Sequence, residues 1–149
     1  MVLPATSKAI EARFRNVERT LDALAIDCVA QIRAAGVTVV DESNRAGFDW
    51  AGPYYVWGYL FDDVKESNGL LERVAVRVKY LEPWEPGAEV RVEVRRRAEV
   101  FSIGQSSQWH DDTLEFLSLE ELEQRGMSAV VTQELAAGRR AIAYRKDAG

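Results

Sequence analysis

His110 is the only histidine in the chain, and it lies in the stretch WHDD beside Asp111 and Asp112. A histidine that is oriented by a carboxylate is able to act as a general base. Adjacent residues rarely face one another, however, and a solvated polar loop is the simpler interpretation of this stretch. His110 is therefore the candidate catalytic residue, provided that the fold turns a carboxylate toward it.

Carboxylates occur as adjacent pairs at Asp41-Glu42, Asp62-Asp63 and Asp111-Asp112. Pairs that converged in space could hold a hard divalent cation, but nothing in their spacing requires this, and we favour a role in solubility and in ending helices and strands. One histidine and one cysteine cannot build the usual structural zinc site. The chain also lacks the common nucleotide-binding, hydrolase and zinc-protease motifs. We therefore expect no metal site and no cofactor.

The run RRR, residues 95–97, interrupts an otherwise regular alternation. Val92 and Val94 lie on one face of a predicted strand, and Arg96 is the next residue on that face. We favour a β-bulge here, or a strand end that reaches water. The alternative is an inward guanidinium that pairs with an internal carboxylate or holds an anionic ligand.

The stretch PYYVWGYLF, residues 53–61, carries five aromatic side chains. We interpret this row as part of a hydrophobic core. The alternative is the wall of a ligand cavity, because a curved sheet covered by one helix can leave a pocket between the two layers. The candidate ligand-binding residues of such a pocket are Trp57, Tyr59, Tyr80 and Arg96, with His110 at its mouth.

A hairpin is predicted to position these side chains. Asn68-Gly69 lies between two apolar-rich runs, and this composition is typical of a two-residue type I′ turn. Such a turn places Trp57, Tyr59 and Phe61 on the same face as the valines of the following strand. The register that it predicts pairs Ser67 with Leu70, Lys65 with Glu72, Phe61 with Val76, Tyr59 with Val78 and Trp57 with Tyr80.

The opposite face of the same strands is predicted to be basic. It carries Arg77, Lys79, Arg91 and Arg95, although the chain as a whole has a net charge of −5. An acidic partner surface would suit this face, and single-stranded RNA is a weaker alternative because Tyr54 is its one stacking aromatic. The candidate interaction residues are Arg77, Lys79 and Arg91, together with two tryptophans predicted to lie in loops, Trp50 and Trp84.

Residues 7–35 read as one long helix, because apolar residues recur at steps of three and four from Ile10 to Cys28. Thr6 or Ser7 is expected to cap its start and Gly36 its end. The apolar stripe is expected to pack on a sheet, and the alternative is that part of it pairs with a second subunit.

The remaining segments have weaker or ambiguous sequence patterns. Residues 37–40 are a short buried strand candidate, whereas residues 41–53 and 102–112 read as loops. Ser118 and Glu121 form a capping box, with a glycine stop at Gly126. Residues 127–145 read either as helix or as a hairpin that turns at residues 136–138.

Together these segments predict a single two-layer α+β domain over residues 1–149, in which a long N-terminal helix packs on an antiparallel meander and a short helix lies near the C-terminus. This arrangement resembles the general layout of the cystatin-like and NTF2-like folds. The resemblance concerns the fold alone, because such folds carry unrelated functions.

Composition narrows the function without naming it. The acidic net charge argues against general nucleic-acid binding, and no apolar run approaches the length of a membrane span. The single cysteine and the absence of a recognisable leader indicate a cytoplasmic protein. We predict a non-catalytic protein-interaction or binding module of bacterial type that forms a dimer. The alternative is a small-molecule-binding protein or cofactor-free enzyme with its pocket between helix and sheet.

Overall fold

The computed structural model describes residues 5–65, 69–85, 87–102, 104 and 107–148. Within these residues, three helices and five strands follow one another. They are α1 (Ala5–Ala34), β1 (Asp41–Asp49), β2 (Gly52–Lys65), β3 (Leu70–Leu81), β4 (Arg91–Ser102), β5 (Ser107–Leu117), α2 (Leu119–Arg125) and α3 (Met127–Ala148).

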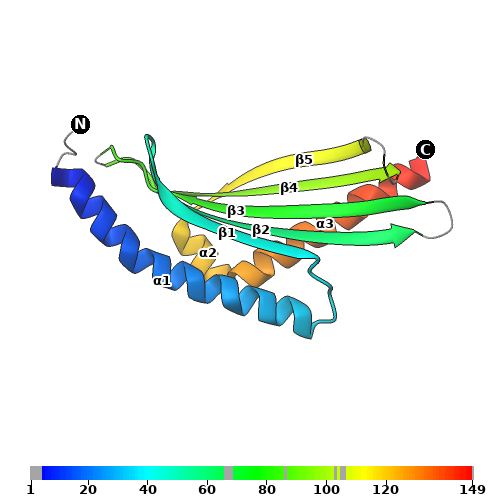
Figure 1. Ribbon diagram of the computed structural model, residues 1–149, viewed down its shortest axis with the longest axis horizontal. Coiled ribbons are helices and arrows are strands. Elements are labelled where there is room, and N and C mark those ends of the chain that lie inside the picture. Colours follow the sequence, from blue (N-terminus) through cyan, green and yellow to red (C-terminus); the bar gives the residue numbers. More distant parts are fainter. Residues whose placement is uncertain (1–4, 66–68, 86, 103, 105–106, 149) are drawn as a thin grey trace.

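The five strands form one antiparallel sheet in the order β1-β2-β3-β4-β5. All three helices lie against the same face of this sheet, and its other face is left open (Figure 1). The predicted two-layer α+β arrangement is confirmed, with a meander of five strands where the sequence predicted three. We call the helix-covered side the inner face and the other side the outer face.

The aromatic row of β2 lies in the core. Its side chains alternate toward the helices, and they pack with those of β3 and α1 in one cluster that includes Tyr55, Trp57, Tyr59, Phe61, Val74, Val76, Val78, Tyr80, Phe14, Leu21 and Cys28. Burying one large apolar side chain contributes roughly 1.5–3 kcal/mol. The aromatic row therefore stabilises the packing of the two layers.

The predicted hairpin register is wrong by two residues. Lys65 pairs with Leu70 and Phe61 with Val74, so four residues connect the strands instead of two, and Asn68 lies outside the described residues. The predicted pairing of Lys65 with Glu72 fails for the same reason. Because side chains alternate with a period of two, a shift of two residues keeps every side chain on its predicted face.

The two edge strands were missed. Residues 37–40 lie outside any strand, and β1 begins only at Asp41, within the predicted loop. Residues 107–112, also predicted as loop, form the first half of β5. An edge strand has a neighbour on one side only, and the inner side of β1 contains just two apolar residues, Ala46 and Phe48. The hydrophobic alternation that identifies a strand is therefore weak in these segments.

The helices follow the predicted pattern. Gly36 takes a positive φ of 84° at the end of α1, which confirms its predicted role. The described part of α1 starts at Ala5, so Thr6 and Ser7 lie within the helix and not before it. Ser118 and Glu121 form the predicted capping box of α2, which ends at Gly126. Residues 127–145, for which the sequence allowed either a helix or a hairpin, lie in the helix α3.

Arg96 does not lie at a bulge. The pairing of β4 with β5 is regular from Val92 to Val100, and its irregularity lies between Val100 and Phe101. The favoured bulge is therefore wrong, and Arg96 points inward with its guanidinium 3.3 Å from Glu134 of α3. A buried carboxylate on the covering helix makes this inward orientation possible, and the strand sequence alone gave no information about that partner.

Candidate functional site

The outer face is a regular grid of side chains, because each strand contributes every second residue to it. One row across the sheet reads Leu114, Arg95, Arg77, Gly58 and Ser43, and the next reads Asp112, Arg97, Ala75, Leu60 and Asp41. Each row contains a small residue on β2 or β3, Gly58 in the first and Ala75 in the second. The arginines of both rows lie on β3 and β4, whereas Ser43 and Asp41 lie on β1.

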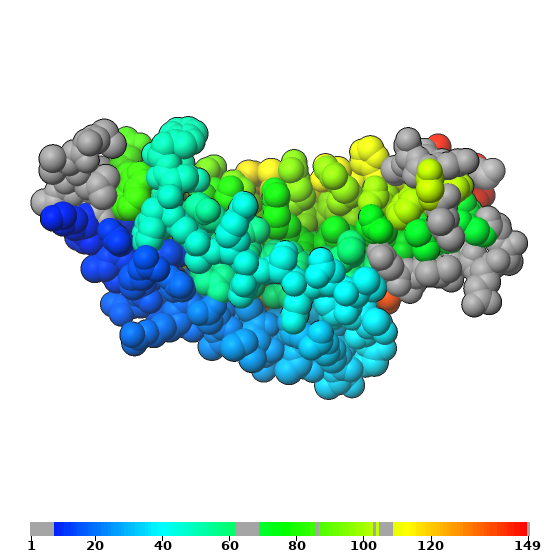
Figure 2. Space-filling view, viewed as in Figure 1, coloured from blue at the N-terminus to red at the C-terminus, as the bar shows by residue number. Residues whose placement is uncertain are grey.

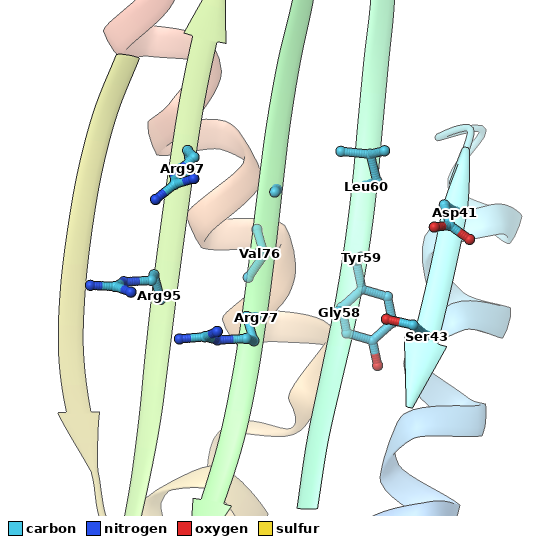
Figure 3. Close-up of a pocket in the computed structure, with 10 residues that line it drawn as sticks. Asp41, Ser43, Gly58, Tyr59, Leu60, Val76, Arg77, Arg95 and Arg97 are labelled. Atoms are coloured by element: carbon cyan, nitrogen blue, oxygen red, sulfur yellow. The ribbon is translucent and has the colours of Figure 1, made fainter. Parts of the chain in front are cut away.

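A hollow of about 310 Å³ opens between these two rows. Gly58, Leu60 and Ala75 form its floor, and Arg77, Arg95 and Arg97 border it on β3 and β4. Figure 3 shows Asp41 and Ser43 on β1, on the opposite side of β2 from the arginines. It also shows Arg77 and Arg95 pointing in the same direction, toward β5 and away from β1. We call this feature the outer hollow.

The arginines of the outer hollow are poorly neutralised. Arg77 and Arg95 are direct partners on neighbouring strands, and like charges in that position are destabilising. Asp112 of β5 lies 3.4 Å from Arg95 and 3.2 Å from Arg97, so one carboxylate serves two guanidiniums. Within the described part of the chain Arg77 has no ion pair. The hollow thus keeps a cation that no internal anion balances.

Gly58 keeps the floor of the outer hollow open. It lies in the interior of β2, its φ is not positive, and the pairing on both sides of it is regular, so the backbone has no need for glycine there. A β-carbon at this position would lie 3.0 Å from Oγ of Ser43. A glycine inside a strand costs stability and often marks a place where a ligand approaches closely. The backbone at this position would accept a side chain, but the Ser43 hydroxyl would have to move to make room for its β-carbon.

A second opening lies on the inner face, between α1 and the edge strand β1. It has a volume of about 520 Å³, and Trp57 and Tyr59 line it together with Ile26, which is 73% exposed. In Figure 2, α1 and β1 lie one above the other on the same side of the molecule. We call this opening the α1–β1 groove, and its further lining residues are Ala25, Val29, Ala30, Arg33, Glu42, Ser43 and Asn44.

The α1–β1 groove is mostly apolar between polar ends. Arg33 lies 3.9 Å from Glu42 at one end, and Tyr55 donates a hydrogen bond to Asp22 near the other. Burial, together with the nearby Glu18 carboxylate, raises the pKa of Asp22. The indole nitrogen of Trp57 is buried and has no hydrogen-bond partner within the described part of the chain.

The four predicted ligand-binding residues do not share one cavity. Trp57 and Tyr59 line the α1–β1 groove, but the ring of Tyr80 stacks on Phe14 at 5.7 Å and its hydroxyl donates to the buried Glu82 at 2.8 Å. Burial raises the pKa of the Tyr80 phenol, and the bond to Glu82 adds to this. Tyr80 thus belongs to the packed core.

Arg96 lies in a buried ion cluster between β4, β5 and α3. Its guanidinium binds Asp111 and Glu134, and Glu134 is only 4% exposed. Burial raises the pKa of Glu134, the negative charge of Glu115 raises it further, and the positive charge of Arg96 opposes both. The cluster ties α3 to the sheet. The guanidinium of Arg96 therefore pairs with carboxylates of the protein itself, at the place where the ligand-binding alternative expected an anionic ligand.

His110 lies on the outer face of β5 and is exposed, whereas Arg96 points into the inner layer. Asp111 points to the inner face as well, where it binds Arg96. Asp112 shares the outer face with His110, but its carboxylate is engaged by Arg95 and Arg97. Glu99, the cross-strand partner of His110, lies 3.7 Å from Arg73. Among the described residues, both carboxylates beside His110 on this face are therefore engaged by arginines.

The pairs Asp41-Glu42 and Asp111-Asp112 diverge because successive residues of a strand point to opposite faces, and the side chains of Asp62 and Asp63 lie outside the described part of the chain. Asp41 lines the outer hollow while Glu42 lines the α1–β1 groove. No group of three or more potential metal ligands occurs among the residues that the structure describes.

The two candidate tryptophans lie beside the turn between β1 and β2, and the three basic candidates lie on the outer face. Arg77 and Arg91 are exposed there, and Lys79 is half-buried. Trp50 is 94% exposed at the turn between β1 and β2. Trp84 stacks on Phe48 and donates to the carbonyl of Asp49 at 2.7 Å, so its ring supports the turn and is only partly accessible.

Sequence reasoning missed three members of the outer hollow, namely Asp41, Ser43 and Gly58. Asp41 and Ser43 were assigned to a loop, so the row that joins them to the arginines could not be seen. Gly58 did carry a signal, because an isolated glycine within an alternating strand pattern indicates a bulge or a close approach.

No protein-family model, no curated protein and no solved structure matches this chain. The resemblance to the cystatin-like and NTF2-like folds therefore stays a prediction. None of the described helices is long and apolar enough to cross a membrane.

Proposed function

We propose that this protein is a non-catalytic, cytoplasmic interaction module that presents its outer sheet face to an acidic protein partner. The observation that carries this proposal is the direct cross-strand pair Arg77–Arg95, in which Arg77 has no carboxylate partner among the described side chains. A like-charge pair on a helix-free surface weakens the isolated protein. An anionic partner would remove that cost on binding.

The surroundings of this pair suit a protein surface. Leu114 and Phe116 are exposed on the same face of β5, and the guanidinium of Arg91 lies 5.7 Å from the centre of the Phe116 ring. Arginine and aromatic side chains are enriched among residues that dominate binding energies. The cations of the outer face outnumber its carboxylates, which include Glu93, Glu99 and Asp112. Such a local excess of positive charge on an acidic protein orients an approaching acidic partner.

Charge reversal outside the outer hollow tests the proposal. The probe is a fluorescein-labelled decaglutamate peptide, whose binding is followed by fluorescence anisotropy at low salt. We expect the double variant Lys79→Glu/Arg91→Glu to weaken binding at least tenfold. The matched control is Arg19→Glu/Arg140→Glu, which makes the same change of net charge at exposed positions of the helical layer.

Equal losses in both double variants would contradict the proposal, because only the net charge would then matter. Sedimentation equilibrium of the wild type alone tests the predicted dimer separately.

The α1–β1 groove favours a second candidate function, the binding of a small, mostly apolar molecule. The observation behind it is that Trp57 and Tyr59 meet the exposed Ile26 in one opening of about 520 Å³, a volume within the range of small-ligand sites. The probe is the dye 8-anilinonaphthalene-1-sulfonate. We expect Ala30→Trp, which fills the groove, to abolish the fluorescence increase that the wild type gives. An unchanged increase would remove this candidate.

A further inference from the structure

The outer hollow differs from the rest of the outer face in its shape as well as in its charge. Its floor carries no side chain at Gly58, whose φ is not positive, and a β-carbon there would already lie 3.0 Å from Oγ of Ser43. A flat acidic protein surface would need the arginines but would gain nothing from a depression between β1 and β3. The depression indicates a compact ligand that enters it.

We propose that the outer hollow binds a small phosphomonoester with a hydroxyl-bearing body, such as a sugar phosphate or a nucleoside monophosphate. This inference rests on the proposed function only in placing its ligand on the same basic face. The phosphate lies over β3 and β4, on the side to which Arg77 and Arg95 point, and the body extends back across the floor toward Ser43 (Figure 3).

The arginines determine the anionic end of the ligand. Each guanidinium has five N–H groups, and the contacts of Arg95 and Arg97 with Asp112 occupy only part of them. Arg77 adds a full set. A phosphate has three terminal oxygens that can accept from three separate side chains, whereas a single carboxylate has two in one plane. Three arginines around one hollow therefore suit a phosphate dianion better than a carboxylate.

The opposite wall determines the other end. Ser43 and Asp41 lie two strand spacings from β3, roughly 10 Å away. The Ser43 hydroxyl can donate or accept, and the exposed Asp41 carboxylate accepts hydrogen bonds from hydroxyl groups. Leu60 and Ala75 provide apolar contact between the two walls. A ligand with a phosphate at one end and hydroxyls at the other matches this order.

Asp41 also limits the class of ligand. A second phosphate at the β1 end of the hollow would face its carboxylate, and like-charge contacts reject an otherwise suitable ligand. Bisphosphates and an extended nucleic-acid backbone are therefore disfavoured, and a monophosphate is preferred. The volume of about 310 Å³ lies at the lower end of the range for small-ligand sites.

Isothermal titration calorimetry at constant ionic strength tests the inference with four probes: inorganic phosphate, ribose, ribose 5-phosphate and adenosine 5′-monophosphate. We expect one of the two esters to bind more tightly than inorganic phosphate, and ribose not to bind. The tighter ester identifies the body of the ligand.

Three variants locate the binding. Arg77→Gln removes the unpaired cation and Gly58→Ala fills the floor, and each is expected to weaken ester binding at least tenfold. Ser43→Ala is expected to weaken the ester and leave inorganic phosphate unchanged. Arg140→Gln on the exposed surface of α3 is the control, with wild-type affinity expected.

The inference is overturned if the esters bind no better than inorganic phosphate, or if Arg77→Gln and Gly58→Ala leave ester binding at the wild-type value. Thermal unfolding of each variant shows whether it is folded, so a lost fold is not mistaken for a lost site. Decaglutamate binding that persists without ester binding would overturn this inference and leave the proposed function standing. Ester binding without decaglutamate binding would do the reverse.

Discussion

At the scale of single residues, two arginines of the sheet differ in whether a carboxylate pairs with them. Arg96 points inward and is held by Glu134 and Asp111, whereas Arg77 stands beside Arg95 on the open face. Removing one member of a buried ion pair leaves an uncompensated charge and costs about 3–5 kcal/mol. We expect no such loss at Arg77, because its removal relieves a repulsion.

The buried Glu134 gives a prediction about pH. Its folded-state pKa is raised, mainly by burial, so the folded protein holds this proton more tightly than the unfolded chain does. The stability that the raised pKa contributes is fully present below the ordinary glutamate pKa and is lost as pH rises through the folded value. Glu115, Arg96 and Arg125 are the charged groups that act on it.

We therefore expect Glu134→Gln to gain stability relative to the wild type as pH rises from about 4.5. Urea unfolding of both proteins at a series of pH values measures this difference. A difference that stays constant with pH, or that shrinks as pH rises, would show that the pKa of Glu134 is not raised.

At the scale of elements, the contact between α3 and β3 depends on a glycine. A β-carbon at Gly138 would lie 2.7 Å from Cγ1 of Val74 and 3.3 Å from Cδ of Arg96. Val74 is buried and β-branched, so its side chain has few alternative rotamers. The helix can approach the sheet this closely only without a side chain at position 138.

We expect Gly138→Ala to destabilise the protein by about 1–3 kcal/mol through overpacking, although alanine is the better helix former by about 1 kcal/mol. Denaturant unfolding measures the change. The double variant Gly138→Ala/Val74→Ala provides the control, because the smaller partner makes room for the new methyl group. A stabilising effect of the single variant would contradict the close contact.

The elements also show what a sequence can and cannot reveal. α1 and the faces of β2 and β3 were predicted because their apolar residues repeat strongly with one period. The register was not, since a shift of two residues leaves the same side chains on the same faces. β1 and β5 were missed because their sequences lack a clear hydrophobic alternation. They are strands because each pairs with one neighbouring strand.

At the scale of the whole molecule, all the helices lie on one face of the sheet and leave the other to water (Figure 1). The sequence predicted this division from the alternation of valines with arginines and lysines. It could not predict the outer hollow, because that feature needs the row that joins Ser43, Gly58 and Arg77 across three strands. Such rows exist only once the strand order and register are known.

The central claim is that Gly58 and the Arg77–Arg95 pair of the outer face serve binding and lower the stability of the fold. Gly58 costs roughly 0.5–1 kcal/mol relative to alanine in a strand, and the Arg77–Arg95 repulsion costs a few tenths more. The backbone conformation requires neither feature, and the contact that a β-carbon at position 58 would make is with the exposed Ser43 hydroxyl, which a change of rotamer can move.

The most direct test is the free energy of unfolding of the double variant Gly58→Ala/Arg77→Gln, measured by urea denaturation at low ionic strength without added anions. The two residues are cross-strand partners, so they are changed together and their effects are not assumed to add. We predict that the variant is as stable as the wild type or more stable by up to about 1.5 kcal/mol. A loss of more than about 1 kcal/mol, the usual result of a point mutation, would show that these residues serve the fold and would contradict the claim.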